Sequence, residues 1–272
     1  MNKKSLSYPY LLWMAILIVV PLLLVLFFAF TVKSGEGYVF SLTNLEKFFQ
    51  PMFLKVFWKS VELALKATII CILLGYPVAL ILADSKFSHR NTMLILIILP
   101  MWMNLLLRTY AWMTLLENNG IINQFLQRIG WGPVQWMYNE QAIILGMIYN
   151  FLPFMILPIY AVLIKIDKSI IEAAKDLGAN DSMVFRKVIF PLSMGGVVSG
   201  TMMVFMPALS TFIIPKLMSG GKISLIGNVI EQQFLVVGDW HFGSFMAFIL
   251  MLIIFISMLF LGEEKIEGGG VL

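Results

Sequence analysis

The sequence predicts an all-α membrane protein with six transmembrane helices, and three observations support this prediction. Of its 272 residues, 60% are hydrophobic and only 12% are charged, which is about half the charged share of an ordinary soluble domain. The mean hydropathy is +0.90. The charged residues are separated by continuous apolar runs, close to the length of about 20 residues that a helix needs to cross a bilayer. A transmembrane barrel would alternate apolar and polar residues instead.

The gaps between charged residues define the spans. The first run follows Lys3 and Lys4 and is longer than the apolar core of a signal peptide, so we expect an uncleaved helix. We expect residues 1–262 to form one transmembrane domain and residues 263–272, which include three consecutive glycines, to form a flexible cytoplasmic tail. The predicted spans lie near residues 10–32, 60–83, 92–116, 141–164, 192–215 and 242–262.

The connections between the spans predict the orientation of the chain. Alternating spans place the N-terminus, the connections 84–91 and 165–191 and the C-terminal tail on one side, with ten Lys and Arg residues. The longer loops 33–59, 117–140 and 216–241 lie on the other side and contain seven. Because basic residues are denser in cytoplasmic connections, we expect both termini to be cytoplasmic.

Composition and motifs exclude several classes of function. So apolar a chain cannot be a soluble enzyme or a disordered regulator, and its net charge of +4 comes from scattered residues rather than from a nucleic-acid-binding cluster. Cys71 lies in an apolar run and is predicted to be a buried thiol. Gly220-Gly221-Lys222 lacks the first glycine of a P-loop, so we expect no ATP hydrolysis by the chain itself. His89 and His241 are far apart and Cys71 is the single cysteine, so we expect no metal site. We also expect no bound cofactor.

Charged residues and prolines near the spans are the first candidates for function. Arg108 stands within the third span, where a charge is costly unless it faces protein or water. It either lines a cavity or gate, or it reaches the outer interface or pairs with Glu117. Glu62 and Lys66, four residues apart, are expected to form an ion pair on one face of a helix. The prolines that we expect to bend or interrupt helices are Pro21, Pro77, Pro100, Pro153, Pro158 and Pro207.

The connection 165–191 predicts a helix–turn–helix on the cytoplasmic side. Ser169 and Glu172 fit a capping box that starts a helix, Gly178 can end it in a left-handed conformation, and Asn180 or Asp181 can cap the next helix. The helix would carry an apolar edge formed by Ile170, Ile171, Ala174 and Leu177. That edge either docks into a groove of a partner or folds against the chain's own bundle.

This connection resembles the EAA loop of the permeases of bacterial ABC importers. The resemblance is carried by Glu172-Ala173-Ala174, Gly178, Phe185 and Pro191, in a cytoplasmic connection that precedes the penultimate span. It implies a type I ABC importer permease bundle whose coupling helix inserts into an ATPase subunit. The coupling residues implied are Glu172, Ala173, Ala174 and Leu177 on the docking helix and Gly178 at its turn.

Further segments resemble the permeases for spermidine and putrescine. They are Leu107–Trp112, Asn118–Asn123, Ile226–Phe234 and Asp239-Trp240. The resemblance implies a subunit that forms half of the pathway of an ATP-driven polyamine importer in the bacterial inner membrane. A second permease subunit, two cytoplasmic ATPase subunits that bind ATP, and a periplasmic binding protein are the implied partners.

The segment 207–216 departs from that pattern, because relatives often carry an acidic residue where this chain offers Ser210, Thr211 and Lys216. We therefore expect other subunits to supply carboxylates for a polyamine. Arg108 would repel a cation, so we expect it to gate or to pair. The residues expected along the pathway or at its gate are Trp102, Arg108, Tyr110, Trp112, Glu117, Tyr149 and Asn150. Two alternatives remain: a permease of the same class for another small solute, and an integral-membrane enzyme.

Overall fold

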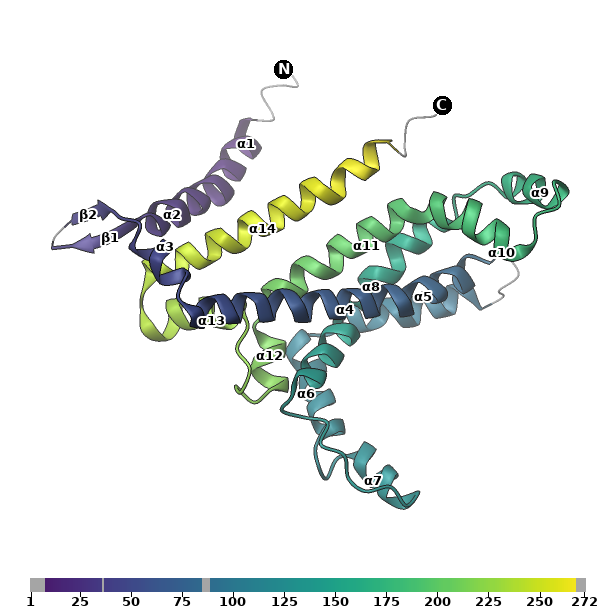
Figure 1. Cartoon of the computed structure of the whole chain (residues 1–272), viewed down its shortest axis with the longest axis horizontal. Coiled ribbons are helices and arrows are strands. Elements are labelled where there is room, and N and C mark those ends of the chain that lie inside the picture. Colours follow the sequence, from purple (N-terminus) through teal and green to yellow (C-terminus); the bar gives the residue numbers. More distant parts are fainter. Residues whose placement is uncertain (1–7, 36, 85–88, 268–272) are drawn as a thin grey trace.

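The computed structural model describes residues 8–35, 37–84 and 89–267, which form a bundle of long helices with one small β-hairpin (Figure 1). The hairpin pairs β1 (Thr31–Ser34) with β2 (Gly37–Phe40). The helices are α1 (Tyr8–Met14), α2 (Val20–Ala29), α3 (Thr43–Phe48), α4 (Pro51–Ala83), α5 (Arg90–Ile98), α6 (Leu105–Leu116), α7 (Ile121–Arg128), α8 (Glu140–Leu163), α9 (Lys168–Asp176), α10 (Asp181–Val184), α11 (Phe190–Ser210), α12 (Ile213–Met218), α13 (Ile226–Gln232) and α14 (Trp240–Glu267).

The core of the bundle is built by α4, α8 and α11, which pack closely because small residues line their contacts. On α4 the residues Ala64, Ala67, Cys71 and Ala79 are completely buried, so the thiol lies where the sequence predicted. On α11, Gly196 and Gly200 stand four apart and face α8. A methyl group added at Gly200 would lie 2.7 Å from the sulfur of Met155. Small residues at this spacing let helix backbones approach in lipid.

A second apolar cluster joins the two ends of the chain to this core. The helices α2 and α14 lie side by side, with α3 and α13 at their shared end (Figure 1). Lys47 Nζ pairs with Asp239 at 2.8 Å and lies 4.2 Å from the ring centre of Phe242. Burial raises the pKa of Asp239, but the ammonium of Lys47 and the amide of Phe242 outweigh it and leave the pKa below its ordinary value.

Five helices of the described residues are long and apolar enough to cross a membrane, and a bent pair can supply a sixth crossing. That pair replaces the single helix predicted over 92–116. The chain turns by 101° between Arg90–Trp102 and Leu105–Arg128. Pro100 lies in a 3₁₀ turn at this point, and the side chain of Asn104 starts α6 by accepting a hydrogen bond from the amide of Leu106 at 2.8 Å.

Several helix ends also differ from the prediction. The helix α2 stops at Ala29, so the end of the predicted span 10–32 lies in strand β1. The helix α4 begins at Pro51 rather than near residue 60, because proline suits the first turn of a helix. The helix α11 ends at Ser210 rather than at 215: Thr211 is extended, and Pro215 disfavours a helix through its fourth preceding residue. The helix α14 continues to Glu267 rather than ending near residue 262, because residues 263–267 end the apolar run but favour helix. Residues 268–272 lie outside the described part.

The remaining prolines do not interrupt their helices. The helices α4, α8 and α11 continue through Pro77, Pro153, Pro158 and Pro207. A π-helical turn over Ala15–Val19 comes just before Pro21, and extra-wide turns of this kind accommodate the missing donor of a proline.

Candidate functional site

The helix–turn–helix formed by α9 and α10 stands at one end of the bundle, opposite the β-hairpin (Figure 1). Its first helix begins two residues earlier than predicted. The cap is Asp167, whose carboxylate accepts a hydrogen bond from the amide of Ser169 at 2.9 Å, in place of the capping box of Ser169 and Glu172. The amide and hydroxyl of Ser169 lower the pKa of Asp167, so this cap keeps its charge at neutral pH.

The turn of this element follows the predicted chemistry. Gly178 has a φ of +85°, and the amides of Gly178 and Ala179 donate to the carbonyls of Lys175 at 2.8 Å and Ala174 at 3.1 Å. These two bonds form a Schellman motif, which ends a helix at a left-handed glycine. Asn180 then caps α10 by accepting from the amide of Met183 at 2.8 Å.

An ion pair closes the same turn. The ammonium of Lys175 lies 2.8 Å from the carboxylate of Asp181, and this contact raises the pKa of Lys175. The turn is thus held by backbone bonds, a side-chain cap and an ion pair.

The helix α9 has one face toward the bundle and one toward solvent. Ile171, Glu172 and Lys175 line a pocket of about 410 Å³ whose far wall is formed by the ends of α4 and α8. Leu177 points away and is 90% exposed. One side of the element therefore packs on its own bundle, as one alternative predicted, and the other leaves the apolar side chain of Leu177 exposed. Docking into a groove of a partner stays a prediction.

Arg108 is buried in the first turn of α6 and is 8% exposed. Its Nε and Nη1 atoms have no hydrogen-bond partner in the described part of the chain. The predicted pairing with Glu117 is absent among the ion pairs of the described residues. Glu117 follows the other end of α6, and nine residues of helix span about 13 Å. The guanidinium therefore has unused donors.

The structure brings together some of the predicted pathway residues. The rings of Trp112 and Tyr149 meet edge to face, with centroids 5.1 Å apart. Asn150 follows on α8 and is buried. Its amide nitrogen donates to the carbonyl of Gly146 at 2.8 Å, and its Oδ1 has no partner. Trp102 and Tyr110 are instead exposed, at 84% and 51%, and take no part in this contact.

The segment between α11 and α14 contains an arrangement that sequence reasoning missed. Lys216 on α12 pairs with Glu231 on α13 at 2.8 Å, beside a pocket of about 260 Å³. Asn228 donates to the carbonyl of Phe212 at 2.7 Å, and Gly227 packs so closely on the end of α11 that an added methyl group would lie 2.5 Å from the carbonyl oxygen of Ser210. The motif Ile226–Phe234 was noticed in the sequence, but its contact with Lys216 is set by the tertiary fold.

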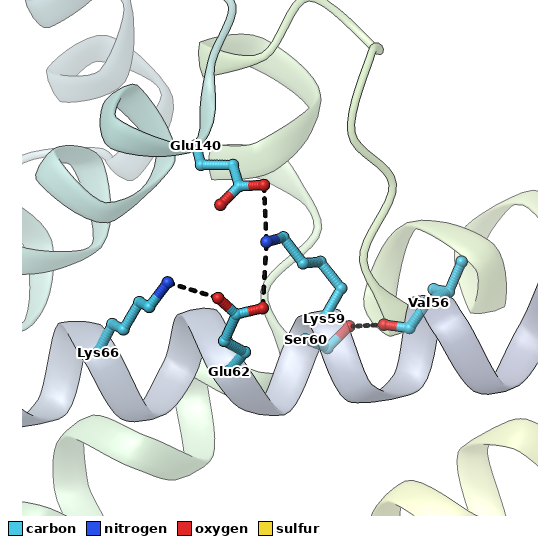
Figure 2. Close-up of polar contacts among 6 residues, drawn as sticks. All are labelled: Val56, Lys59, Ser60, Glu62, Lys66 and Glu140. Atoms are coloured by element: carbon cyan, nitrogen blue, oxygen red, sulfur yellow. Dashed lines mark hydrogen bonds and ion pairs between the residues drawn. The ribbon is translucent and has the colours of Figure 1, made fainter.

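A charged cluster joins α4 to the start of α8 (Figure 2). The ammonium of Lys59 lies 3.1 Å from one carboxylate oxygen of Glu62 and 2.6 Å from Glu140. Lys66 binds the other oxygen of Glu62, so the predicted pair of Glu62 and Lys66 is confirmed. The cluster ties together two helices that pack along their length.

The family described as the inner membrane component of binding-protein-dependent transport systems matches residues 1–263. The chain belongs to this family. The spermidine/putrescine transport system permease protein PotB of Haemophilus influenzae is 39% identical to this permease over 85% of the chain and 83% of that protein. The protein of the same name from Escherichia coli K12 is 36% identical over 91% of the chain and 92% of that protein.

Solved structures share the fold of this permease. A bacterial alginate ABC transporter, in complex with a periplasmic protein bound to an alginate pentasaccharide, has a TM-score of 0.79 at 13% identity. The match covers 95% of this chain and 91% of that chain. The bundle is therefore that of a type I ABC importer permease, as the EAA-like loop implied. Such a permease is not itself an enzyme.

Proposed function

We propose that this chain is a permease subunit of an ATP-driven importer for polyamines of the spermidine and putrescine type. The identity of 36–39% to PotB proteins over most of the chain carries this proposal. The alginate transporter shares only the fold, so it favours no other cargo. The chain would form half of the pathway, with a second permease forming the other half.

In this proposal the α9–α10 element couples the permease to a separate ATPase that binds and hydrolyses ATP. Its support is the exposed Leu177 at the C-terminal cap of α9, a helix fixed at both ends by the cap of Asp167 and by the turn at Gly178. An apolar side chain exposed on an ordered helix suits a groove on a partner. Glu172, Ala173 and Ala174 lie on the same helix.

The proposed location is the bacterial inner membrane with both termini cytoplasmic. A periplasmic binding protein would deliver the cargo to the end that carries the β-hairpin. The denser basic residues in the connections at the α9 end support this orientation, because six crossings return the chain to its starting side. Trp102, Arg108, Tyr110, Trp112, Glu117, Tyr149 and Asn150 remain our candidates for pathway or gate.

Uptake by the complete transporter in proteoliposomes tests the function. We expect saturable, ATP-dependent uptake of labelled spermidine or putrescine, with each competing against the other. Saturable uptake of an anion without competition by polyamines would overturn the proposed cargo and leave the permease class intact.

A further inference from the structure

The pockets that contain charged side chains differ in how well their lining charges suit a bound cation. The pocket beside Lys59 is lined by Lys55, Lys59 and Lys222 against two carboxylates, so its charge disfavours a polycation. The pocket beneath α9 belongs to the proposed coupling element. The pocket between α12 and α13 is smaller and contains one lysine and one glutamate, Lys216 and Glu231.

Glu231 in that pocket already binds an alkylammonium group. Its Oε1 lies 2.8 Å from the Nζ of Lys216. The side chain of Glu231 is 20% exposed, whereas that of Lys216 is 57% exposed. The carboxylate is thus the less exposed partner of the pair, and the lysine is the more exposed one.

The ion pair is not what holds α12 and α13 in place. The two amide atoms of Asn228 bind the carbonyl of Phe212 at 2.7 Å and the amide of Leu225 at 3.1 Å. The amide of Ile226 donates to the buried hydroxyl of Ser60 on α4 at 2.8 Å. Because an exposed lysine–carboxylate pair adds little to stability, loss of the contact with Lys216 leaves this framework intact.

The broken end of α11 adds a favourable field for a cation. This helix stops at Ser210, and the negative end of its dipole faces the segment that Asn228 binds. Interrupted helices whose carboxyl ends point into a membrane protein are a common way to hold cations. Asn228 binds the carbonyl of Phe212, two residues beyond the end of α11, and also lines the pocket, so this one side chain connects the helix end to the pocket.

We propose that Glu231 is a binding subsite for a primary ammonium group of the cargo, occupied by Lys216 until the cargo replaces it. The inference rests on the proposed polyamine function. The ammonium of a lysine side chain and a terminal ammonium of spermidine or putrescine present the same three donors on an alkyl chain. Exchange therefore preserves the hydrogen bond to Glu231 and releases Lys216 to water. No other subunit is needed to supply this carboxylate.

Two substitutions with opposite expected effects test the subsite. In the complete reconstituted transporter, E231Q removes the anionic acceptor and should raise the KM for labelled spermidine about tenfold or more, the value of one charge-assisted hydrogen bond. K216M removes the resident competitor and should lower the KM. A purely structural ion pair predicts that both variants shift the KM in the same direction, because both lose the same bond.

The matched controls are K47M and D239N, which break an ion pair of the same length outside the pocket. We expect both to keep the wild-type KM. Assembly of every variant is checked by size-exclusion chromatography. Suppose that the wild-type transporter takes up spermidine. If E231Q and K216M then both keep the wild-type KM, or both raise it alike, the subsite is overturned and the proposed function stands. A wild-type transporter that takes up no polyamine overturns the proposed function, and the subsite with it.

Discussion

Leu177 provides the sharpest test of ATPase coupling, because its side chain is 90% exposed in this chain. Truncation to alanine removes apolar surface that the isolated permease does not bury, so its own stability should change by less than about 0.5 kcal/mol. If the side chain enters a groove of the ATPase, L177A loses most of the burial energy of a leucine, about 2 kcal/mol. A loss of that size weakens this docking site about 30-fold.

The assay is a titration of the purified permease pair in nanodiscs with the isolated ATPase. The second permease keeps its own docking site, so the titration with L177A should become biphasic, with one class of sites unchanged. ATP hydrolysis stimulated by the loaded binding protein should also be lower for L177A than for the wild type. The control L42A makes the same truncation at a half-exposed leucine beside α3, at the other end of the bundle. A single-phase titration of wild-type affinity for L177A would refute the docking role.

Four further predictions concern the fold and the candidate gate. G178A should destabilise the end of α9 by about 1 kcal/mol, because the φ of +85° at this position disfavours a side chain, and it should uncouple ATP hydrolysis from uptake. The control G195A, which has open space at its Cβ, should leave the coupling unchanged; equal uptake by both variants would contradict this prediction. G200L should abolish the yield of monodisperse protein, since even its first carbon lies too close to Met155; a normal yield would show that α8 and α11 can separate. R108M should keep or raise thermal stability, because it removes a buried charge with unused donors, and should lower uptake; unchanged uptake would leave Arg108 without a role in transport. D239N should lower stability by less than about 1 kcal/mol at neutral pH. Since the folded pKa of Asp239 is lowered, its contribution is complete above about pH 4 and lost as the pH falls further; a deficit independent of pH would argue against the charge.

Local chemistry made much of this fold predictable. Gly178 and Asn180 act within a few residues of their own position, and the structure places both as the sequence predicts. The spans were located by the gaps between charges, and α8 differs from its predicted bounds by a single residue at each end. The breaks within the third and fifth predicted spans were harder to predict, because the apolar residues continue across them. Pro100 and Asn104 mark one break and Pro215 the other, although residues on both sides are equally hydrophobic.

The candidate site was less predictable, because its contacts join distant segments. No local sequence pattern predicts that Lys216 contacts Glu231, because the two residues lie on different helices and are 15 positions apart. The sequence suggested that Lys216 weakens any cation site in this subunit, whereas the fold places a carboxylate directly against it. The proposed pair of Arg108 and Glu117 failed for the converse reason: the residues share one helix but lie at opposite ends of it.

The helix α11 connects the two candidate regions as one rigid element. From the cap at Asn180 the chain is helical through α10, a π-helical turn and α11 as far as Ser210, a run of 30 residues, which spans about 45 Å. The run begins at Asp181, three residues after the turn at Gly178. Its other end contacts Gly227, and Asn228 binds the carbonyl of Phe212, two residues beyond that end. We expect a displacement imposed on α9 to be carried along this helix to the pocket, since packed helices shift as units rather than deform. We expect the exchange of Lys216 for cargo and the docking of Leu177 to be coupled for this reason, so that L177A and K216M measured together depart from additivity.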